Sequence, residues 1–417
     1  MKWIPLFGLL TAACFGAAKP AISAPVEVPA TIDHNRVVIE VEVASSNGAT
    51  QRVRAWVDNG NPELDLSRRL ATALGLSVTC GDNDCSSPPP REISIGGMSI
   101  PLGEVKEAKI PLKPVTAAAV LASGMNVEIN IPSTVLRHYD VLVDFPGHKF
   151  SIGAPGSIHF QGPSTKVQIN ADTGLILVPS QIENKKYQMS LDLGSCISFL
   201  WDEVFAKLVA DHPDWPHMTG GVGSANVWGM DEETKWLVMR VDRVQFGPLF
   251  LTNVPMIDFP GDRFEYFSKR IGIPTGGLLG GNAFLNYRVG LDYAHSLVYF
   301  DIGRLFNFPE FDVIGLILRP EDDGRFTVLG IADSGGSPSV PTGPGGVQSG
   351  DTLLAVDSIP ARGVTMGQVW AMLGGTPGQE RRLTMERAGK TFVVLARVQH
   401  FLAVNEDDSG NKKKKKH

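Results

Sequence analysis

The sequence predicts a mainly β protein built from a repeated unit, and three observations support this prediction. Gly (45 residues) and Pro (29 residues) are frequent while only 20% of the 417 residues are charged, which favours strands joined by tight turns over long charged helices. Segments that alternate apolar and polar residues surround Gly turns, as in "EISIGGMSIPLGEV" at 92–105. The chain also contains an internal repeat, and its 43% of hydrophobic residues can fill the cores of about two to four domains.

The repeat aligns residues 54–76, "RAWVDNGNPELDLSRRLATALGL", with residues 188–210, "QMSLDLGSCISFLWDEVFAKLVA". Each segment has the pattern of a strand, an Asp-x-Gly turn, a short loop and an amphipathic helix. Hairpin-like segments at 139–153 and 287–303 also correspond. We therefore predict two copies of one β unit of about 130 to 140 residues, at 26–156 and 163–304.

The order of these elements resembles a lobe of the retropepsin-like aspartic peptidases. In that family a hydrophobic-hydrophobic-Gly segment supports the catalytic loop, and "GGLLGGNAFLNYRVGLDY" at 276–293 matches it. Two such units in one chain resemble the pepsin-like aspartic peptidases, over about residues 30–303. The first unit departs from the pattern, because "VEINIPSTVLRHYDVLVDF" at 127–145 stands in place of the Gly-rich segment. The resemblance implies a mainly β fold in which two acid-protease lobes form a pseudo-dimer.

Residues 312–400 differ in character and resemble a PDZ domain. The resemblance is carried by a Gly-Leu-x-Leu type loop, the Gly350-Asp351 turn before "TLLAVD", a helix and a closing hairpin. It implies that a bound peptide adds to the sheet as a strand. It also implies that the peptide's C-terminal carboxylate accepts backbone N–H groups from Gly315, Leu316, Ile317 and Leu318.

The resemblance identifies Asp58 and Asp192 as the catalytic pair of an aspartic-type endopeptidase. Two close carboxylates share one proton, because like charges at that distance do not both ionise easily. The ionised carboxylate activates a water molecule, and the protonated one polarises the scissile carbonyl. Gly60 and Gly194 allow a tight turn that brings N–H donors to the carboxylates. This chemistry needs no cofactor and no metal, and no Cys/His spacing in the sequence is typical of a zinc site.

The residue between Asp and Gly departs from the family pattern in both units. The family has Thr or Ser there, whose hydroxyl bonds across the interface between the lobes. Asn59 has an amide that donates and accepts, whereas Leu193 has no polar atom. Ser195 keeps a hydroxyl beside the second Asp, and Asn61 occupies the equivalent place in the first unit. An alternative therefore stays open: a catalytically inactive protein that binds an extended peptide in the same cleft.

Two other peptidase-like motifs are interpreted as turns. Asp172–Gly174 is the only Asp-Thr-Gly in the chain, but it lies one hairpin before the predicted catalytic loop, where a turn needs Asp and Gly. "ADSGGSP" at 332–338 resembles the surroundings of a trypsin-like nucleophile, but that chemistry also needs a His base with an orienting Asp. His295 falls in a predicted hairpin, and Asp144 and Asp292 are interpreted as turn formers.

Residues 1–23 have the pattern of a signal peptide, with Lys2 before a short apolar run and small residues. We expect export to a bacterial periplasm or secretion, either by cleavage after Ser23 or as a lipoprotein anchored to a membrane through Cys14. In an oxidising compartment Cys80 and Cys85 can form a disulfide. Cys196 is expected to be a small buried hydrophobe.

The charge pattern indicates the kind of partner. The net charge of −6 and the absence of a basic stripe interleaved with aromatic residues argue against a nucleic-acid partner. The expected partners are a peptide or unfolded protein substrate and, through the PDZ-like module, protein C-termini. Residues 404–417 end in "KKKKKH" and are predicted to form a disordered charged tail.

Overall fold

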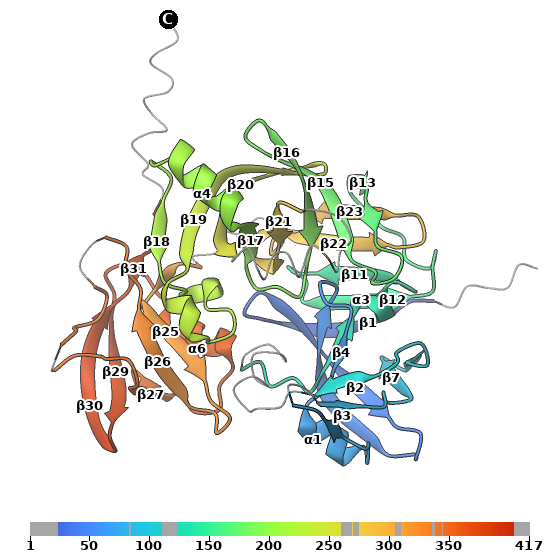
Figure 1. Cartoon of the computed structure of the whole chain (residues 1–417), viewed down its shortest axis with the longest axis horizontal. Coiled ribbons are helices and arrows are strands. Elements are labelled where there is room, and N and C mark those ends of the chain that lie inside the picture. The colour runs from blue at the N-terminus through green and yellow to red at the C-terminus, as the bar shows by residue number, and fades with distance from the viewer. Residues whose placement is uncertain are drawn as a thin grey trace, which may run out of the picture.

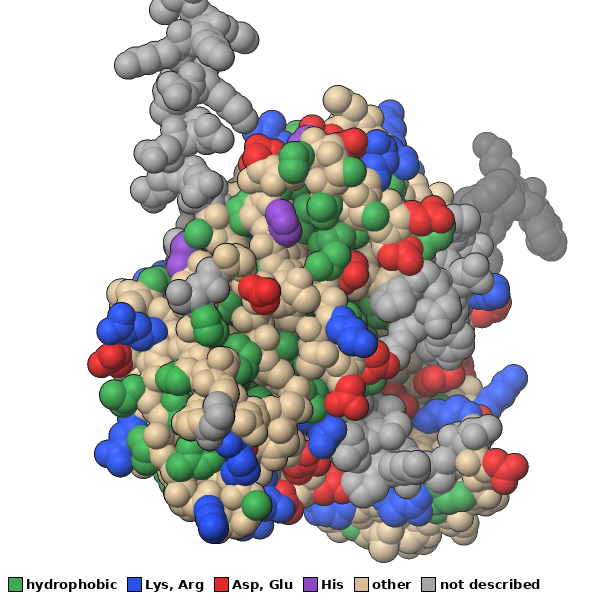
Figure 2. All heavy atoms as spheres, turned by 60° about the vertical axis from the view of Figure 1, so that its left-hand side comes forward, with side chains coloured by type: hydrophobic (Ala, Val, Ile, Leu, Met, Phe, Trp, Pro, Cys, Tyr) green, Lys and Arg blue, Asp and Glu red, His purple; other side chains and the backbone are tan. Residues whose placement is uncertain are grey.

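The protein is mainly β (Figure 1), and its computed structural model describes residues 24–82, 85–110, 124–259, 269, 275–304, 310–335, 338–343 and 345–403. The segments predicted as a signal peptide (1–23) and a charged tail (404–417) lie outside these residues. No helix among the described residues is long and apolar enough to cross a membrane. On the face drawn in Figure 2, Lys and Arg side chains alternate with Asp and Glu and do not gather into one basic patch.

In residues 26–156, here called the first unit, the part that the structure describes forms short strands and short helices. The strands are β1 (Val26–Asp33), β2 (Arg36–Ala44), β3 (Thr50–Asp58), β4 (Leu64–Asp65), β5 (Thr79–Cys80), β6 (Cys85–Ser87), β7 (Glu92–Ile95), β8 (Met98–Pro101), β9 (Ala108–Ile110), β10 (Ile129–Pro132), β11 (Asp140–Asp144) and β12 (Lys149–Gly153). The helices are α1 (Arg68–Ala73) and α3 (Ser133–Leu136). Ser67 caps α1 by accepting the N–H of Leu70, which satisfies one of the free donors at the helix start.

Residues 163–304, the second unit, have a similar composition of elements. The strands are β13 (Ser164–Lys166), β14 (Gln168–Ile169), β15 (Ile176–Ile182), β16 (Lys185–Leu191), β17 (Ser198–Trp201), β18 (His217–Thr219), β19 (Leu237–Phe246), β20 (Leu249–Phe259), β21 (Gly277–Leu279), β22 (Tyr287–Asp292) and β23 (Leu297–Ile302). The helices are α4 (Asp202–Asp211) and the 3-10 helices η1 (Gly223–Ala225), η2 (Asp231–Thr234) and η3 (Gly281–Ala283). Helix α4 buries Val204, Phe205 and Leu208 on one face.

The same strand pairing surrounds Asp58 and Asp192. In the first unit β10 runs parallel to β3, with Pro132 opposite Asp58, and Leu66 bridges to Ile129 in antiparallel fashion. In the second unit β21 runs parallel to β16 and antiparallel to β17. The segment at 127–145 lacks the glycines of its counterpart, but it still supplies the strand that supports the Asp-x-Gly loop. Apolar Ile129 and Ile131 are wholly buried there, so packing takes the place of the glycine-rich sequence.

The two units share one sheet and one core. Strand β11 pairs with β22 in antiparallel fashion, so that Val141 faces Leu291 and an 11-stranded sheet crosses from one unit to the other. A single cluster of buried apolar side chains includes Val57 of the first unit and Leu191 of the second. The relative position of the two Asp-x-Gly loops is therefore fixed by packing and by backbone hydrogen bonds.

Residues 312–400, the C-terminal module, pack against the second unit (Figure 1). The strands are β24 (Asp312–Val313), β25 (Leu316–Pro320), β26 (Phe326–Ile331), β27 (Thr352–Val356), β28 (Ile359–Pro360), β29 (Glu380–Arg387), β30 (Lys390–Arg397) and β31 (Gln399–His400), with helix α6 (Met366–Leu373). Its core is continuous with Cys196 and Phe199 of the second unit. Asp33 of the first unit accepts the N–H of Gly367 at the start of α6, so the module also contacts the first unit.

Candidate active site

Asp58 and Asp192 lie at the ends of equivalent strands and face each other across the interface between the units. Asp58 is the last residue of β3, and Asp192 directly follows β16. A methyl group added at Gly60 would overlap the carboxylate of Asp192, and one at Gly194 would overlap that of Asp58. Each carboxylate thus lies against the glycine of the opposite loop. Neither glycine has a positive φ, so neither is needed for a left-handed backbone turn. Glycine is required at both positions because a carboxylate approaches closely where a side chain would lie.

Backbone donors hold the Asp192 carboxylate. Its Oδ1 accepts the N–H of Gly194 at 2.9 Å and the N–H of Ser195 at 3.0 Å. Asp58 accepts the N–H of Gly60, but its Oδ2 is buried and has no partner among the described residues. The two carboxylates are therefore unequal, because only Asp192 has two donors that stabilise its ionised form.

Both carboxyl groups are almost wholly buried, with 3% of Asp58 and 6% of Asp192 exposed. Burial raises the pKa of Asp58 well above its usual range, and the charge of Asp192 raises it further. Burial also raises the pKa of Asp192, to about 6, although the N–H groups of Gly194 and Ser195 oppose this rise. The pair therefore keeps at least one proton at a pH where ordinary carboxylates are ionised.

Asn59 joins the two loops through both ends of its amide. Its Oδ1 accepts the N–H of Leu193 at 2.7 Å, and its Nδ2 donates to the carbonyl of Leu191 at 2.7 Å. The side chain of Leu193 is buried in the core and makes no polar contact in return. The hydrogen bonds expected between the two loops are thus made by the first unit alone. Asn59 makes both of them, and the side chain of Leu193 makes none.

Ser195 and Asn61 stabilise their own loops. The hydroxyl of Ser195 donates to the carbonyl of Ile197 at 2.7 Å, while only its N–H contacts Asp192. The amide of Asn61 donates to Asp65 at 2.8 Å and accepts the N–H of Glu63.

Arg36 is a residue of this site that sequence reasoning missed. It opens β2 and is 1% exposed, with Nε donating to the carbonyl of Gly194 at 3.1 Å. The only sequence signal is an Arg at the start of the otherwise apolar "RVVIEVEV", which is equally typical of a surface residue at a strand end.

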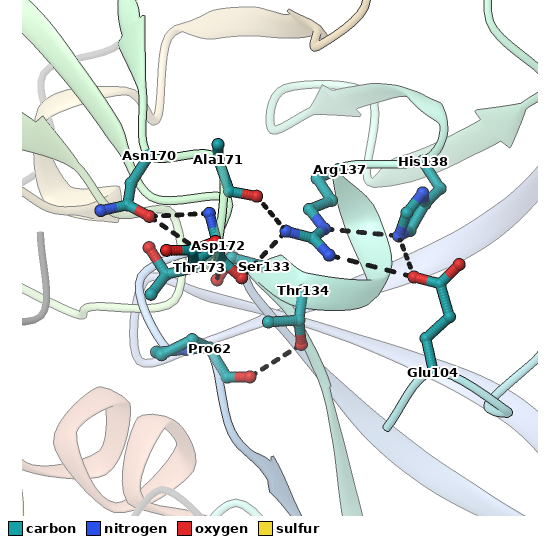
Figure 3. Close-up of polar contacts among 10 residues, drawn as sticks. All are labelled: Pro62, Glu104, Ser133, Thr134, Arg137, His138, Asn170, Ala171, Asp172 and Thr173. Atoms are coloured by element: carbon teal, nitrogen blue, oxygen red, sulfur yellow. Dashed lines mark hydrogen bonds and ion pairs between the residues drawn. The ribbon is translucent and has the colours of Figure 1, made fainter. Parts of the chain in front are cut away.

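The Asp-Thr-Gly motif forms a turn between β14 and β15 (Figure 3). Asn170 accepts the N–H groups of Asp172 and Thr173 through its side-chain oxygen. Arg137 donates to the carbonyls of Ala171 and Asp172, and the hydroxyl of Ser133 donates to the carbonyl of Thr173. The contacts of this motif therefore fasten the second unit to α3 of the first through backbone oxygens.

The remaining motif residues also lie in turns or bridges. Asp144 accepts the N–H of Gly147, and Asp292 accepts the N–H of His295, so both carboxylates stabilise hairpin turns. Asp333 exchanges two backbone hydrogen bonds with Thr219. Part of the 332–338 motif, residues 336–337, lies outside the described residues.

The loop predicted to receive a peptide carboxylate is already engaged within the chain. Gly315 N–H donates to the hydroxyl of Ser339 at 2.8 Å, and Leu316 N–H donates to the carbonyl of Ile314 at 2.8 Å. The amide of Asn226, from the second unit, accepts the N–H of Leu318 and donates to its carbonyl, both at 3.0 Å. A peptide that binds at Gly315, Leu316, Ile317 and Leu318, as the sequence predicts, must therefore displace these partners, because a strand edge can bond only one partner at a time.

A buried carboxylate supports Asn226 in this position. Glu233 accepts the Nδ2 of Asn226 at 2.6 Å and the N–H groups of Trp228 and Met230. Burial raises the pKa of Glu233 to about 7. Nothing in the sequence indicated Asn226, because an Asn in a loop is ordinary and its partner lies in another module.

Of the cysteines that the structure describes, two form a disulfide and one is a free thiol. Cys80 and Cys85 form a disulfide between β5 and β6. Cys196 is a free, buried thiol whose Sγ lies 3.2 Å from the carbonyl of Ser224, and burial raises its pKa to about 12. Among the described residues there is no group of three or more His, Cys, Asp or Glu side chains placed to hold a metal ion.

Comparison with known proteins finds similarity among solved structures. No family model matches the chain, and no curated protein matches it. Among solved structures, the chain is similar to an aspartic proteinase from Irpex lacteus, with 12% sequence identity and a TM-score of 0.39. This similarity covers 67% of the present chain and 98% of the fungal one.

The raised pKa values of the pair predict that the folded protein loses stability as pH rises. The folded state binds more protons than the unfolded state between the ordinary pKa near 3.8 and the raised values, so the stability that the pair contributes is full below about pH 3.8. It is lost as pH rises from there through about 6, the pKa of Asp192, toward the raised pKa of Asp58. The slope is about 1.4 kcal/mol per pH unit for each proton. Urea unfolding at pH 4 to 8 measures it. Asp58→Asn/Asp192→Asn should remove the part due to the pair and leave that of Glu233; an unchanged slope would refute the shared-proton interpretation.

Asn59→Ala should destabilise the protein by about 2 to 5 kcal/mol, because it leaves the buried N–H of Leu193 and carbonyl of Leu191 without partners. Chemical denaturation measures this loss. Asn184→Ala, at an exposed turn, is the matched control and should change stability by less than about 0.5 kcal/mol. Equal effects of the two substitutions would mean that Asn59 does not join the loops.

Proposed function

We propose that the protein is an aspartic-type endopeptidase, in which the first and second units are retropepsin-like lobes that form a pseudo-dimer. The observation that supports this most directly is the reciprocal placement of the two carboxylates, each against the glycine of the opposite loop. Isolated Asp-x-Gly turns are common in proteins. Two of them at equivalent places in a repeat, buried together and sharing a raised pKa, form the arrangement needed to hydrolyse a peptide bond with an activated water.

The unequal surroundings of the two carboxylates assign their roles. Asp192 has two N–H donors on one oxygen, which favour its ionised form, so it acts as the base that takes a proton from water. Asp58 has an oxygen without a partner among the described residues and a pKa raised by burial and by Asp192, so it holds the shared proton and donates a hydrogen bond to the scissile carbonyl. Attack of the water then gives a tetrahedral intermediate, and the leaving amine takes up a proton as the C–N bond breaks.

The second candidate function is peptide binding without hydrolysis. It is favoured by the burial of both carboxylates, because a substrate reaches them only after covering groups move. The apolar Leu193, in place of a hydroxyl residue, favours it as well. The unpartnered oxygen of Asp58 favours the enzyme, since a buried polar atom without a partner is costly to keep in a purely structural site.

We further propose that the C-terminal module is a PDZ domain that acts first as an internal partner. Its edge strand β25 bonds Asn226 of the second unit, and Gly229 packs against Arg319 and Pro320 of the same edge. A protein C-terminus that adds to β25 must displace Asn226. We place this activity outside the cytoplasm, on the basis of the signal-peptide pattern at 1–23.

Hydrolysis is tested with an unfolded protein and a mixed peptide pool from pH 3 to 8. Wild type should cut best above about pH 6, because one carboxyl must ionise and the pKa of Asp192 is about 6. Asp58→Asn and Asp192→Asn should each lower kcat/KM by at least about 1000-fold, since both carboxyls act as a unit. Asp172→Asn, in the turn of Figure 3, is the matched control and should keep wild-type activity. Cleavage that persists in both Asn variants would refute the assignment of hydrolysis to Asp58 and Asp192, and binding without cleavage in wild type would favour the second candidate.

The internal occupation of β25 is tested with a pool of C-terminal hexapeptides and fluorescence polarisation. Asn226→Ala should bind the pool at least about 5-fold more tightly than wild type, because the N–H and carbonyl of Leu318 become free to pair with a peptide strand. The same peptides with amidated C-termini should bind more weakly. Equal binding by wild type and Asn226→Ala would show that this edge is not the peptide site.

A further inference from the structure

Arg36 is a buried cation whose hydrogen-bond partners are backbone carbonyls. Nε donates to Gly194 at 3.1 Å and Nη2 donates to Val227 at 3.2 Å, while Nη1 has no partner among the described residues. Its guanidinium carbon lies 5.6 Å from the centroid of the Trp56 ring. Carbonyl dipoles and a ring face stabilise a positive charge but do not neutralise it, so the charge of Arg36 needs an anion nearby.

The turn that precedes Arg36 fixes its position. His34 and Asn35 both have positive φ, and this turn between β1 and β2 reaches into the second unit. Asn35 donates to the carbonyl of Cys196 at 3.0 Å, and Nε2 of His34 lies 2.9 Å from the carbonyl of Gly223. Gly281 also packs against the carbonyl of Asn35, where no side chain fits. Arg36 is therefore held behind the loop that carries Asp192.

The ionisable groups that face Arg36 reduce to one source of negative charge. Burial and the charge of Arg36 lower the pKa of His34 to about 3, and burial raises that of Cys196 to about 12, so both groups are neutral near pH 7. Asp33 has its own cation, Arg54, at 3.6 Å, and also accepts the N–H of Gly367. Two further buried carboxyls lie near, and each has partners of its own: Glu310 accepts the Nδ2 of Asn35 and has Arg240 as its cation, and Glu233 accepts the Nδ2 of Asn226 and two N–H groups. Burial raises the pKa of both, which favours their neutral forms. The carboxyl groups left to balance Arg36 are those of Asp58 and Asp192. With one shared proton the pair carries a single negative charge, which balances the single positive charge of Arg36.

We propose that Arg36 is a positioning residue of the catalytic pair: it supplies the buried positive charge that keeps one carboxylate ionised, and it holds the Gly194 carbonyl so that the loop directs its N–H groups to Asp192. The proposal rests on the proposed function and deepens it. Burial alone favours two protons on the pair, which would leave no base for water. The charge of Arg36 opposes this tendency at both carboxyls, as the lowering effect of Arg36 on the pKa of each indicates.

The test compares Arg36→Met, Arg36→Lys and Arg52→Met. Arg52 lies on β3 with Asp58, but its side chain is 78% exposed and its partner is the exposed Glu40, so its replacement removes the same charge without touching the site. In a plot of kcat/KM against pH, Arg36→Met should move the rise on the acidic side at least one pH unit upward. It should also lower activity at pH 6 at least 10-fold. Arg36→Lys should keep the limb near its wild-type position, and Arg52→Met should change neither quantity. A merely structural role would lower activity at every pH without moving the limb.

A second measurement needs no activity and separates this proposal from the proposed function. Urea unfolding from pH 4 to 8 should show that Arg36→Met extends the loss of stability to higher pH, because the pair keeps its protons longer. In Asp58→Asn/Asp192→Asn the same substitution should produce no such extension. If wild type cuts nothing but this difference is found, the charge balance holds and only the peptidase proposal fails. An equal effect of Arg36→Met in both backgrounds would overturn the charge balance.

Arg36→Lys covers the case in which Arg36→Met does not fold. It keeps the positive charge, so it should fold and retain the wild-type dependence of stability on pH. A Lys variant that folds but extends the loss of stability to higher pH would overturn the proposal, since the charge would then not be what the pair requires.

Discussion

The contact between the two Asp-x-Gly loops determines most of what surrounds it. Each carboxylate lies against the opposite glycine, so there is little space in which the two loops can shift relative to each other. The amide of Asn59 holds the loops in this position with hydrogen bonds to Leu191 and Leu193. The shared sheet at β11 and β22 and the common apolar core keep the units from sliding apart. The raised pKa values follow from the same contact, since it buries two acids together.

The surroundings of the pair form a connected set of buried polar groups. Arg36 contacts Gly194 and Val227, and the next residue back, Asn226, bonds the edge of the C-terminal module. Glu233 holds Asn226 from the other side. The segment around Asn226 thus lies between the peptide-binding edge expected of the module and the loop of Asp192. Two adjacent residues, Asn226 and Val227, connect the two ends.

The sequence predicted those features that depend on a pattern. Asp58 and Asp192 were found because the repeat aligns them, and Asp172 was set aside because its neighbours predict a turn without a following helix. The amide of Asn59 was recognised as able to donate and accept, but its use of both ends across the interface depends on the approach of the loops. Arg36 and Asn226 escaped notice because their partners are carbonyl and N–H groups up to 191 residues away, and every residue carries those groups. The sequence of the first unit lacks the glycine-rich segment that forms the support strand in the second unit. A support strand still forms there beside β3, because Ile129 and Ile131 are wholly buried.

The shared sheet has a consequence for how the chain may be divided. The units are joined through an exposed turn at Pro155 and Gly156, and each contributes one aspartate and one of the two central strands. A break in that turn gives two fragments, neither of which contains a complete site. The two halves would regain the pair only by reassociating through β11 and β22, so the state of the pair would report whether the two fragments have met.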